Sequence, residues 1–389
     1  MTTDVRPLLL HVVYRFDIGG LENGIVNLIN HMPLNAYRHA VLALTEVTNF
    51  RQRIQRNDVK FISLGKPPGH GVWQYPKLFK LFSELRPAIV HTRNLAALEV
   101  QIPAWAAGVP VRIHGEHGRD VGDLDGNNVL YQRVRRFYKP FVDHYTALST
   151  DLVDYLVNKV HVAPEAITQT YNGVDVESFC SAADGPQPIA GCPFDPSQHW
   201  LVGSVGRMQA VKDPVMLAHA FVQAIKLAPE LIHHMRLVMV GDGPVRDHAK
   251  AVLAAADMSL LAWFPGERND VADVMRGLHA FAMPSLSEGI CNTILEAMAS
   301  SLPVVATAVG GNADLVVHGQ TGKIVQPGDS QAMAYTLVQL AFNPERARLM
   351  GQAGRQRVVS NFSMHAMVSK YQSMYDQKLK RGQAFFESV

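Results

Sequence analysis

PSLSEGICNTILEAMASSLPVVAT, residues 284–307, contains the pattern that decides the fold. It follows the apolar run HAFAM, turns at Ser-Glu-Gly, enters a helical stretch that ends near Ser300, and starts a second apolar run at Pro303. A strand, a loop, a helix and another strand in this order form the unit from which parallel sheets are built. Open parallel sheets bind ligands beyond the carboxyl ends of their strands, so the loop that carries Glu288 is a candidate site.

The same alternation of short apolar runs and amphipathic stretches extends along the whole chain. The runs that we predict to be strands begin near residues 8, 39, 59, 88, 111 and 143, and again near 199, 236, 261, 279 and 303. Between the two series, residues 172–198 are rich in Gly, Pro, Ser and Asp, which is typical of a linker. The sequence therefore predicts an α/β protein of two domains, each with a parallel sheet covered by helices on both faces.

Composition narrows the class of protein. The chain has 389 residues and a net charge of +2, which suits two domains and gives no overall field that would select nucleic acid. Three cysteines without a CxxC motif favour a reducing compartment, with a disulfide between Cys180 and Cys192 as the alternative. No apolar run is long enough to span a membrane, and the first residues lack a signal-peptide layout. We expect a cytoplasmic protein that can still touch a membrane surface.

Two carboxylates and a helix start give the 284–307 stretch its chemistry. Glu288 lies in the loop and Glu296 lies about two turns into the helix. The backbone N–H groups of residues 289–292 are unpaired at a helix start, which suits an anion. Glu288 can bind sugar hydroxyls and Glu296 can hold a ribose diol. The alternatives are a helix cap for Glu288 and a solvated helix glutamate for Glu296.

This stretch, with its two glutamates eight positions apart, a run of small residues and a Pro-Val-Val strand, resembles the signature of the retaining GT-B glycosyltransferases of family four. GSVGRMQAVKD (203–213) resembles the start of the second domain in that family. The resemblance, which extends to exopolysaccharide-associated sugar transferases, implies two Rossmann-like domains whose parallel sheets face an interdomain cleft. The expected boundaries are 1–180 for the acceptor-side domain, 181–198 for the linker, 199–363 for the nucleotide-sugar-binding domain, and a C-terminal helix, 364–389, that completes the first domain.

The resemblance assigns the donor to the second domain. Arg207 and Lys212 are expected to bind the donor diphosphate, whose charge grows as it departs, so fixed cations stabilise the transition state more than the ground state. FPGERNDV (264–271) resembles the segment that contacts the nucleobase. The residues implied to bind the donor are Gly19, Gly20, Gly206, Arg207, Lys212, Gly266, Glu267, Glu288, Gly289, Ile290, Cys291, Asn292 and Glu296.

Glycines and a histidine mark the acceptor-side domain. Gly19 and Gly20 stand between the first strand and the first helix, where backbone can approach a phosphate closely. Their spacing to Gly24 differs from the Gly-x-Gly-x-x-Gly fingerprint and disfavours an NAD site. In RIHGEHGRDVGD (112–123) the resemblance implies an active-site histidine, His117, with His114 as the alternative. The HxxH spacing also admits a metal site, although no other metal-ligating pattern accompanies it.

Two further groups concern the acceptor. Arg119 and Asp120 are candidates for acceptor contact. YQRVRRFYKPFVDHY (131–145) places Arg133, Arg135 and Arg136 beside aromatic residues, which fits either a face against anionic lipid or a solvated helix with a packed aromatic side.

The resemblance implies a retaining, metal-independent hexosyl- or N-acetylhexosaminyl-transferase with His117, Arg207, Lys212 and Glu288 as catalytic residues. Its partners would be a nucleotide-sugar donor and a glycan or lipid-linked acceptor, with no cofactor, and its setting exopolysaccharide or other cell-surface glycan synthesis. Two alternatives remain. A nucleotide-sugar epimerase would convert the donor alone, and a non-catalytic sensor would bind the donor without turnover.

Overall fold

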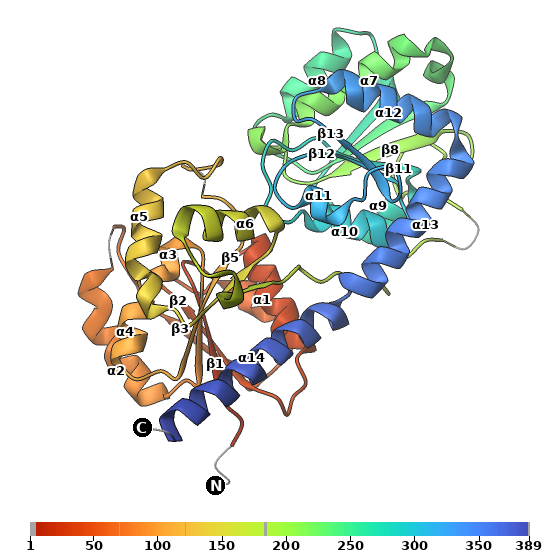
Figure 1. Ribbon diagram of the computed structural model, residues 1–389. Helices are drawn as coiled ribbons and strands as arrows, with labels where there is room; N and C mark the ends of the chain where they lie inside the picture. Colours follow the sequence, from red (N-terminus) through yellow and green to blue (C-terminus); the bar gives the residue numbers. More distant parts are fainter. Residues whose placement is uncertain (1–4, 70, 121, 183–184, 388–389) are drawn as a thin grey trace. The chain divides into compact units, whose positions relative to one another are not determined.

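The computed structural model describes residues 5–69, 71–120, 122–182 and 185–387, and the chain divides into two compact units (Figure 1). Unit 1 contains Met1–Gly173 and Met364–Val389, and unit 2 contains Val174–Ser363. Both units are α/β with fully parallel sheets, so the predicted fold class is confirmed. No described helix is both long enough and apolar enough to cross a membrane.

Unit 1 has a parallel sheet in the order β3-β2-β1-β4-β5-β6-β7. The strands are β1 (Leu8–Val13), β2 (Arg38–Ala43), β3 (Lys60–Ser63), β4 (Ile89–Arg93), β5 (Val111–Glu116), β6 (His144–Ala147) and β7 (Ile167–Gln169). The α-helices are α1 (Gly20–His31), α2 (Tyr75–Leu85), α3 (Leu95–Leu98), α4 (Gln101–Ala106), α5 (Val129–Tyr138), α6 (Thr150–Tyr155) and α14 (Met364–Glu387). Short 3₁₀ turns lie at 49–53, 72–74, 139–141 and 164–166, and a π turn at 156–160.

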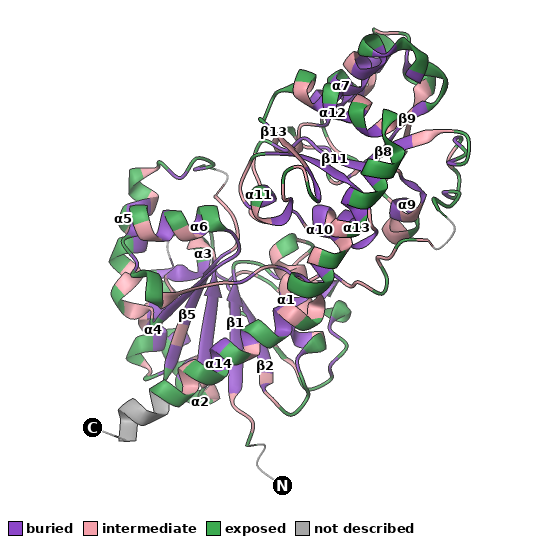
Figure 2. Cartoon of the chain, turned by 45° about the vertical axis from the view of Figure 1, so that its right-hand side comes forward, coloured by how far each residue is buried: buried purple, intermediate pink, exposed green. Residues whose placement is uncertain are grey.

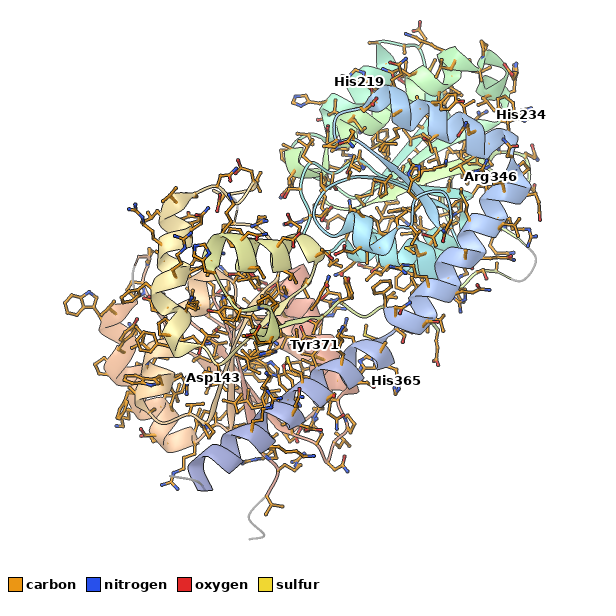
Figure 3. All side chains as sticks on the ribbon, viewed as in Figure 1. Asp143, His219, His234, Arg346, His365 and Tyr371 are labelled. Carbon is orange, nitrogen blue, oxygen red and sulfur yellow. The ribbon has the colours of Figure 1, made fainter. Side chains whose placement is uncertain are left out.

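The last helix of the chain belongs to unit 1. Helix α14 packs beside α1 on one face of the sheet, where Tyr371 and Tyr375 join a cluster that includes Leu9 of β1 and Ile89 of β4. Figure 3 shows Tyr371 on the sheet side of α14, whereas His365 is exposed. On the opposite face, α2, α3 and α4 bury their apolar side chains against the same strands. The central strands β1, β4 and β5 are therefore covered on both faces, and β1 and β5 are drawn as mainly buried in Figure 2.

Unit 2 has a parallel sheet in the order β10-β9-β8-β11-β12-β13. The strands are β8 (Trp200–Val205), β9 (Met235–Val240), β10 (Ala262–Gly266), β11 (Ala280–Met283), β12 (Val304–Thr307) and β13 (Gly322–Val325). The α-helices are α7 (Pro214–Leu227), α8 (Arg246–Ala254), α9 (Val271–Gly277), α10 (Asn292–Ala299), α11 (Asn312–Leu315), α12 (Ser330–Phe342) and α13 (Pro344–Asn361). Short 3₁₀ turns lie at 210–212, 229–233 and 259–261. Helices α7, α8 and α12 share one apolar core with the strands, and α10 packs against α9 and α13.

The strand orders locate the functional edge of each sheet. In unit 1 the order reverses between β1 and β4, and in unit 2 it reverses between β8 and β11. Ligands of doubly wound sheets bind beyond the carboxyl ends of the strands at such a switch point. The loops that follow β1, β4, β8 and β11 are therefore the segments that the fold places best for binding.

The unit boundary differs from the predicted linker, 181–198. The chain changes unit between Gly173 and Val174, and the segment after residue 184 packs on unit 2. The Gln187 N–H donates to the Arg276 carbonyl at 3.0 Å, and the Ile189 side chain is buried against Gly277. This segment is rich in Gly and Pro but forms a covering layer of unit 2, because its few apolar side chains have a core to enter.

Candidate functional site

In unit 2, the loop after β8 is held tightly against the loop after β9. The Gly206 N–H donates to the Val240 carbonyl at 3.0 Å, and a Cβ on Gly241 would lie only 2.0 Å from the Gly206 oxygen. Glycine is required at position 241, where φ is +128°. This close packing fixes the backbone from which Arg207 projects. The Arg207 side chain is exposed and has no ion-pair or hydrogen-bond partner in the described part of the chain.

Lys212 and Glu288 meet at the same edge. Nζ of Lys212 lies 2.5 Å from Oε1 of Glu288, and the Ser285 hydroxyl donates to the same oxygen at 2.6 Å. The two loops are also joined through their backbones, because the Leu286 N–H donates to the Val211 carbonyl at 2.8 Å. The Glu288 carboxylate thus neutralises the Lys212 ammonium group.

The Glu288 loop rests on a second layer of fixed groups. The Thr307 hydroxyl at the end of β12 donates to the Ser285 carbonyl at 2.6 Å, and both side chains are fully buried. Gly310, with φ +49°, lies directly against the loop. A Cβ at this position would come within 1.8 Å of the backbone carbonyl oxygen of Glu288. The Gly311 N–H donates to the Gly289 carbonyl at 2.9 Å. The loop is therefore supported by Thr307, Gly310 and Gly311, and the Glu288 carboxylate itself is held by Ser285 and Lys212.

The start of α10 presents unused backbone donors. No described group accepts a hydrogen bond from the N–H groups of Gly289, Ile290 or Cys291. Cys291 occupies the N-cap position without a side-chain cap bond to the helix backbone, and its buried side chain has a pKa raised to about 11, mainly by desolvation. The thiol stays neutral and adds no negative charge. This helix start, together with Asn292, can receive an anion.

Glu296 lies further along α10 and is half-buried. Burial raises the pKa of its carboxyl to about 7, and no described side chain forms an ion pair or hydrogen bond with it. A carboxylate in this state has unused acceptor capacity that a diol can satisfy. Gly266 ends β10 with φ +84°, and its carbonyl accepts the Gly241 N–H at 2.8 Å, whereas the Glu267 side chain is exposed.

In unit 1, Gly19 and Gly20 form the uncapped start of α1 at the carboxyl end of β1. The Glu22 carboxylate folds back over this turn, so a Cβ on Gly19 would lie 2.2 Å from Glu22 Oε2. Burial raises the pKa of Glu22. A side chain at position 19 would displace this carboxylate from the turn.

The two candidate histidines have different surroundings. His114 is fully buried within β5, and its ring lies 2.8 Å from the Thr92 hydroxyl and 3.4 Å from Glu116. His117 follows β5, and its backbone N–H donates to the Asn94 side-chain oxygen at 2.8 Å. Both ring nitrogens of His117 are enclosed without a hydrogen-bond partner among the described residues. Burial first, and the Arg93 charge second, hold the His117 pKa well below its usual value, so the ring is neutral.

The structure corrects the prediction for Arg135. Its side chain is 4% exposed and makes two hydrogen bonds to Glu116, at 2.6 and 3.1 Å, and one to Asp120 at 2.9 Å. Arg119 pairs with Asp151 at 2.9 Å and stacks on the Tyr155 ring. The Arg135 guanidinium also lies over the Tyr155 ring, so Arg119, Asp120 and Arg135 belong to one packed network. Arg135 is not available to a membrane or an acceptor.

Arg133 and Arg136 remain on the surface of α5. The Arg136 guanidinium donates to the Lys159 carbonyl, and its side chain is still exposed. Phe137, the residue after Arg136, is 63% exposed. Within the described ranges, no three His, Cys, Asp or Glu side chains gather as metal ligands would. Of the HxxH pair, the His114 ring contacts Thr92 and Glu116. Cys180, Cys192 and Cys291 are free.

Three residues with a place in the site were missed by the sequence analysis: Asn94, Ser285 and Gly310. Asn94 directly follows β4, and Ser285 lies just after β11, so both stand at switch-point strand ends. A polar residue immediately after an apolar strand run was the available signal. The need for glycine at 310 depends on a contact with a loop more than twenty residues away and leaves no local signal.

Comparison with known proteins identifies the family of the chain. Residues 18–178 match the family described as "Glycosyltransferase Family 4", and residues 200–343 match "Glycosyl transferases group 1". Among curated proteins, the chain is 27% identical over 310 residues to UDP-Gal:alpha-D-GlcNAc-diphosphoundecaprenol alpha-1,3-galactosyltransferase of Escherichia coli, covering 77% of each chain. It is 26% identical over 321 residues to the capsular polysaccharide biosynthesis glycosyltransferase CapM of Staphylococcus aureus, covering 79% of this chain and 81% of CapM.

Among solved structures, HepE of Anabaena in complex with UDP and glucose superposes with a TM-score of 0.77 at 18% identity, covering 96% of this chain and 100% of HepE. At that identity the likeness shows a shared fold. Together, the two family matches span most of the chain, and the fold shared with HepE covers 96% of it. The chain therefore belongs to the group 1 glycosyltransferases, with the GT-B fold, and is a glycosyltransferase.

Proposed function

We propose that this glycosyltransferase moves a sugar, with retention of anomeric configuration, from a nucleotide-sugar donor to a glycan or lipid-linked acceptor. The observation that carries the proposal is the donor edge of unit 2. There, Arg207 and Lys212 stand with the open N–H groups of α10, while Glu288 and Glu296 offer carboxylates. Positive groups flanked by two hydroxyl-binding carboxylates match a diphosphate that lies between two sugars.

The cations would act on the leaving group. As the bond from the anomeric carbon to phosphate breaks, its electron pair leaves with the diphosphate, and Arg207, Lys212 and the α10 start stabilise the added charge. These groups supply what a divalent cation supplies in other transferases, so we expect activity without added metal. Lys212 would exchange Glu288 for a phosphate oxygen on donor binding, which frees the carboxylate for sugar hydroxyls.

The acceptor would react on the same face that the diphosphate leaves. Its hydroxyl oxygen bonds to the anomeric carbon, and its proton passes to the departing phosphate oxygen, which gives retention. Glu296 would hold the ribose diol, and the Gly266–Glu267 turn would lie near the nucleobase. In unit 1, neutral His117 would offer a hydrogen bond to the transferred sugar, and the Gly19–Gly20 turn would approach the diphosphate.

The relatives support the classes of substrate. The Escherichia coli relative is named for a UDP-galactose donor and a diphosphoundecaprenol-linked acceptor, CapM for capsular polysaccharide, and the HepE structure for UDP and glucose. We therefore propose a UDP-sugar donor and a place in exopolysaccharide or other cell-surface glycan synthesis. None of these relatives is named an epimerase, and that alternative gains no support.

We also propose cytoplasmic action at the inner face of the membrane, through the exposed side of α5. Arg133 and Arg136 would meet anionic headgroups beside Phe137 and Leu130, which are 63% and 65% exposed. Sedimentation with vesicles of anionic and of neutral lipid tests this. The double variant Arg133→Ala, Arg136→Ala should lose binding to the anionic vesicles and leave sedimentation with the neutral vesicles unchanged. Binding of the double variant to anionic vesicles at the wild-type level would contradict the proposal.

The central test uses thermal shifts and turnover. A panel of UDP-glucose, UDP-galactose, UDP-N-acetylglucosamine, GDP-mannose and ADP-glucose should contain a donor that raises Tm, because a ligand of the folded state stabilises it. Arg207→Ala and Lys212→Met should reduce that shift and lower kcat by roughly 100-fold or more each. Lys226→Met, an exposed lysine of α7, is the control and should change neither. Full turnover after loss of both cations would refute the proposal, and conversion of donor without acceptor would indicate an epimerase.

A further inference from the structure

Asn94, which directly follows β4, has a backbone conformation that few residues adopt. Its φ is 58° and its ψ is 166°. This region of backbone space is populated almost entirely by glycine, and a side chain there stores strain of a kind that collects at functional sites. Asparagine is tolerated at positive φ better than most residues, but chiefly with a smaller ψ. Something in the structure must hold Asn94 in this conformation.

The neighbours of Asn94 explain how it is held. Its N–H donates to the Gly115 carbonyl of β5 at 2.8 Å, and its carbonyl accepts the Ala97 N–H at 3.1 Å. Its side-chain oxygen accepts the His117 N–H at 2.8 Å. The orientation of the amide is fixed, because a backbone N–H can only donate and must face the oxygen. Asn94 thus bonds to β5 at Gly115 and to the loop just beyond it at His117.

The usual reason for an asparagine at this place does not apply. Asn94 immediately precedes α3, where asparagine commonly caps the helix, but its side chain makes no cap bond to α3. The side chain is committed to His117 instead. His117 in turn has no ring hydrogen bond among the described residues to orient it, so its position depends on its backbone.

We propose that Asn94 is a positioning residue. It adopts a strained backbone conformation from which its side chain holds His117 at the carboxyl edge of the unit 1 sheet. The proposal rests on the role given to His117 under the proposed function. Three observations support this proposal. The Asn94 backbone is strained, its side chain binds the His117 N–H, and no described residue hydrogen-bonds the His117 ring, so Asn94 fixes the backbone of the histidine.

Variants at position 94 separate strain from positioning. Asn94→Ala and Asn94→Gly both remove the bond to His117, but only glycine relieves the strain. Asn94→Gly should therefore have a Tm several degrees above that of Asn94→Ala, while kcat falls about 10-fold or more in both, as expected for a displaced catalytic group. KM for the donor should change less than kcat, because the unit 2 groups proposed to bind the diphosphate and the nucleoside are untouched. Asn94→Asp keeps an acceptor oxygen and should restore most of kcat.

Arg86 provides a matched control at the opposite end of the same strand. It precedes β4, has φ 46° and ψ 57°, and is exposed. Arg86→Gly should raise Tm and leave kcat unchanged. Turnover is followed as release of the nucleoside diphosphate from the UDP-, GDP- or ADP-sugar that the wild-type protein uses.

The outcomes distinguish the two claims. If His117→Ala keeps full turnover, the role of His117 in the proposed function fails. If His117→Ala is impaired but Asn94→Gly retains wild-type kcat, the backbone alone places the histidine and the inference about Asn94 is overturned. Equal Tm values for Asn94→Ala and Asn94→Gly would overturn the strain argument.

Discussion

Glu296→Gln should stabilise the protein at alkaline pH and weaken donor binding. The Glu296 carboxyl has a pKa of about 7 against an ordinary value of 4.5, because burial in α10 disfavours its charged form. The folded protein keeps this proton up to about pH 7, whereas the unfolded chain releases it near 4.5. Stability therefore falls as pH rises from 4.5 to about 7, and the full cost applies above 7.

The structure sets the size of the effect. At about 1.36 kcal/mol per unit of pKa, the shift corresponds to about 3 kcal/mol. The side chain is only half-buried, so we expect about half of this, which is about 3–6 °C in Tm for a unit of this size. Glutamine cannot ionise, so Glu296→Gln should melt higher than wild type at pH 8, and most of this difference should vanish at pH 5.

Differential scanning fluorimetry at several pH values measures both effects. Glu230→Gln, at an exposed glutamate of unit 2, is the control and should show no pH-dependent difference. With donor present, the wild type should gain more Tm at pH 8 than at pH 6, because the ionised carboxylate accepts both ribose hydroxyls, and Glu296→Gln should lose part of that gain. A Tm difference between variant and wild type that is equal at pH 5 and pH 8 would refute the reasoning.

Two further predictions concern the support of the donor loop. Ser285→Ala removes the hydroxyl that would keep the Glu288 carboxylate in place once the lysine turns to phosphate, and should lower kcat/KM by roughly 10- to 100-fold in a turnover assay, as loss of a hydrogen bond to a charged group does. Ser287→Ala in the same loop is its control, and equal loss in both would contradict the prediction. Gly310→Ala forces a methyl group into the Glu288 carbonyl and should lower Tm and the donor-induced shift together. Gly328→Ala, which has a similar φ of +76° in open space, should lower Tm alone, and an equal loss of the donor shift in Gly328→Ala would argue against steric displacement of the loop.

Much of the fold could be predicted from the sequence, because strands of a parallel sheet that is covered on both faces are continuous apolar runs. The predicted strand, residues 8–14, contains β1 (Leu8–Val13), which is buried throughout. The donor edge was readable because Lys212 and Glu288 follow strands that become neighbours at the switch point, although 76 positions separate them. Both residues lie in the loops that follow these strands, and the resemblance to family four singled them out.

Other features depend on contacts that local sequence does not encode. Arg135 was read as a surface cation, but two carboxylates from another segment, Glu116 and Asp120, neutralise it in a packed network. The sequence predicts a linker at 181–198, but within it the Ile189 side chain is buried against unit 2. The strain at Asn94 lies in its backbone angles φ and ψ, which the residue type does not predict.

The route of the chain between the units has a consequence for biosynthesis. Unit 2 is one continuous segment inserted into unit 1, and its first and last residues pair directly, Val174 with Ser363. Unit 2 can thus complete its sheet while the ribosome still holds the remainder. The face of unit 1 around His91 stays open until Tyr375 emerges to hydrogen-bond that imidazole at 2.8 Å. The nascent protein thus completes unit 2 first, and unit 1 matures only when its closing helix, α14, has been made.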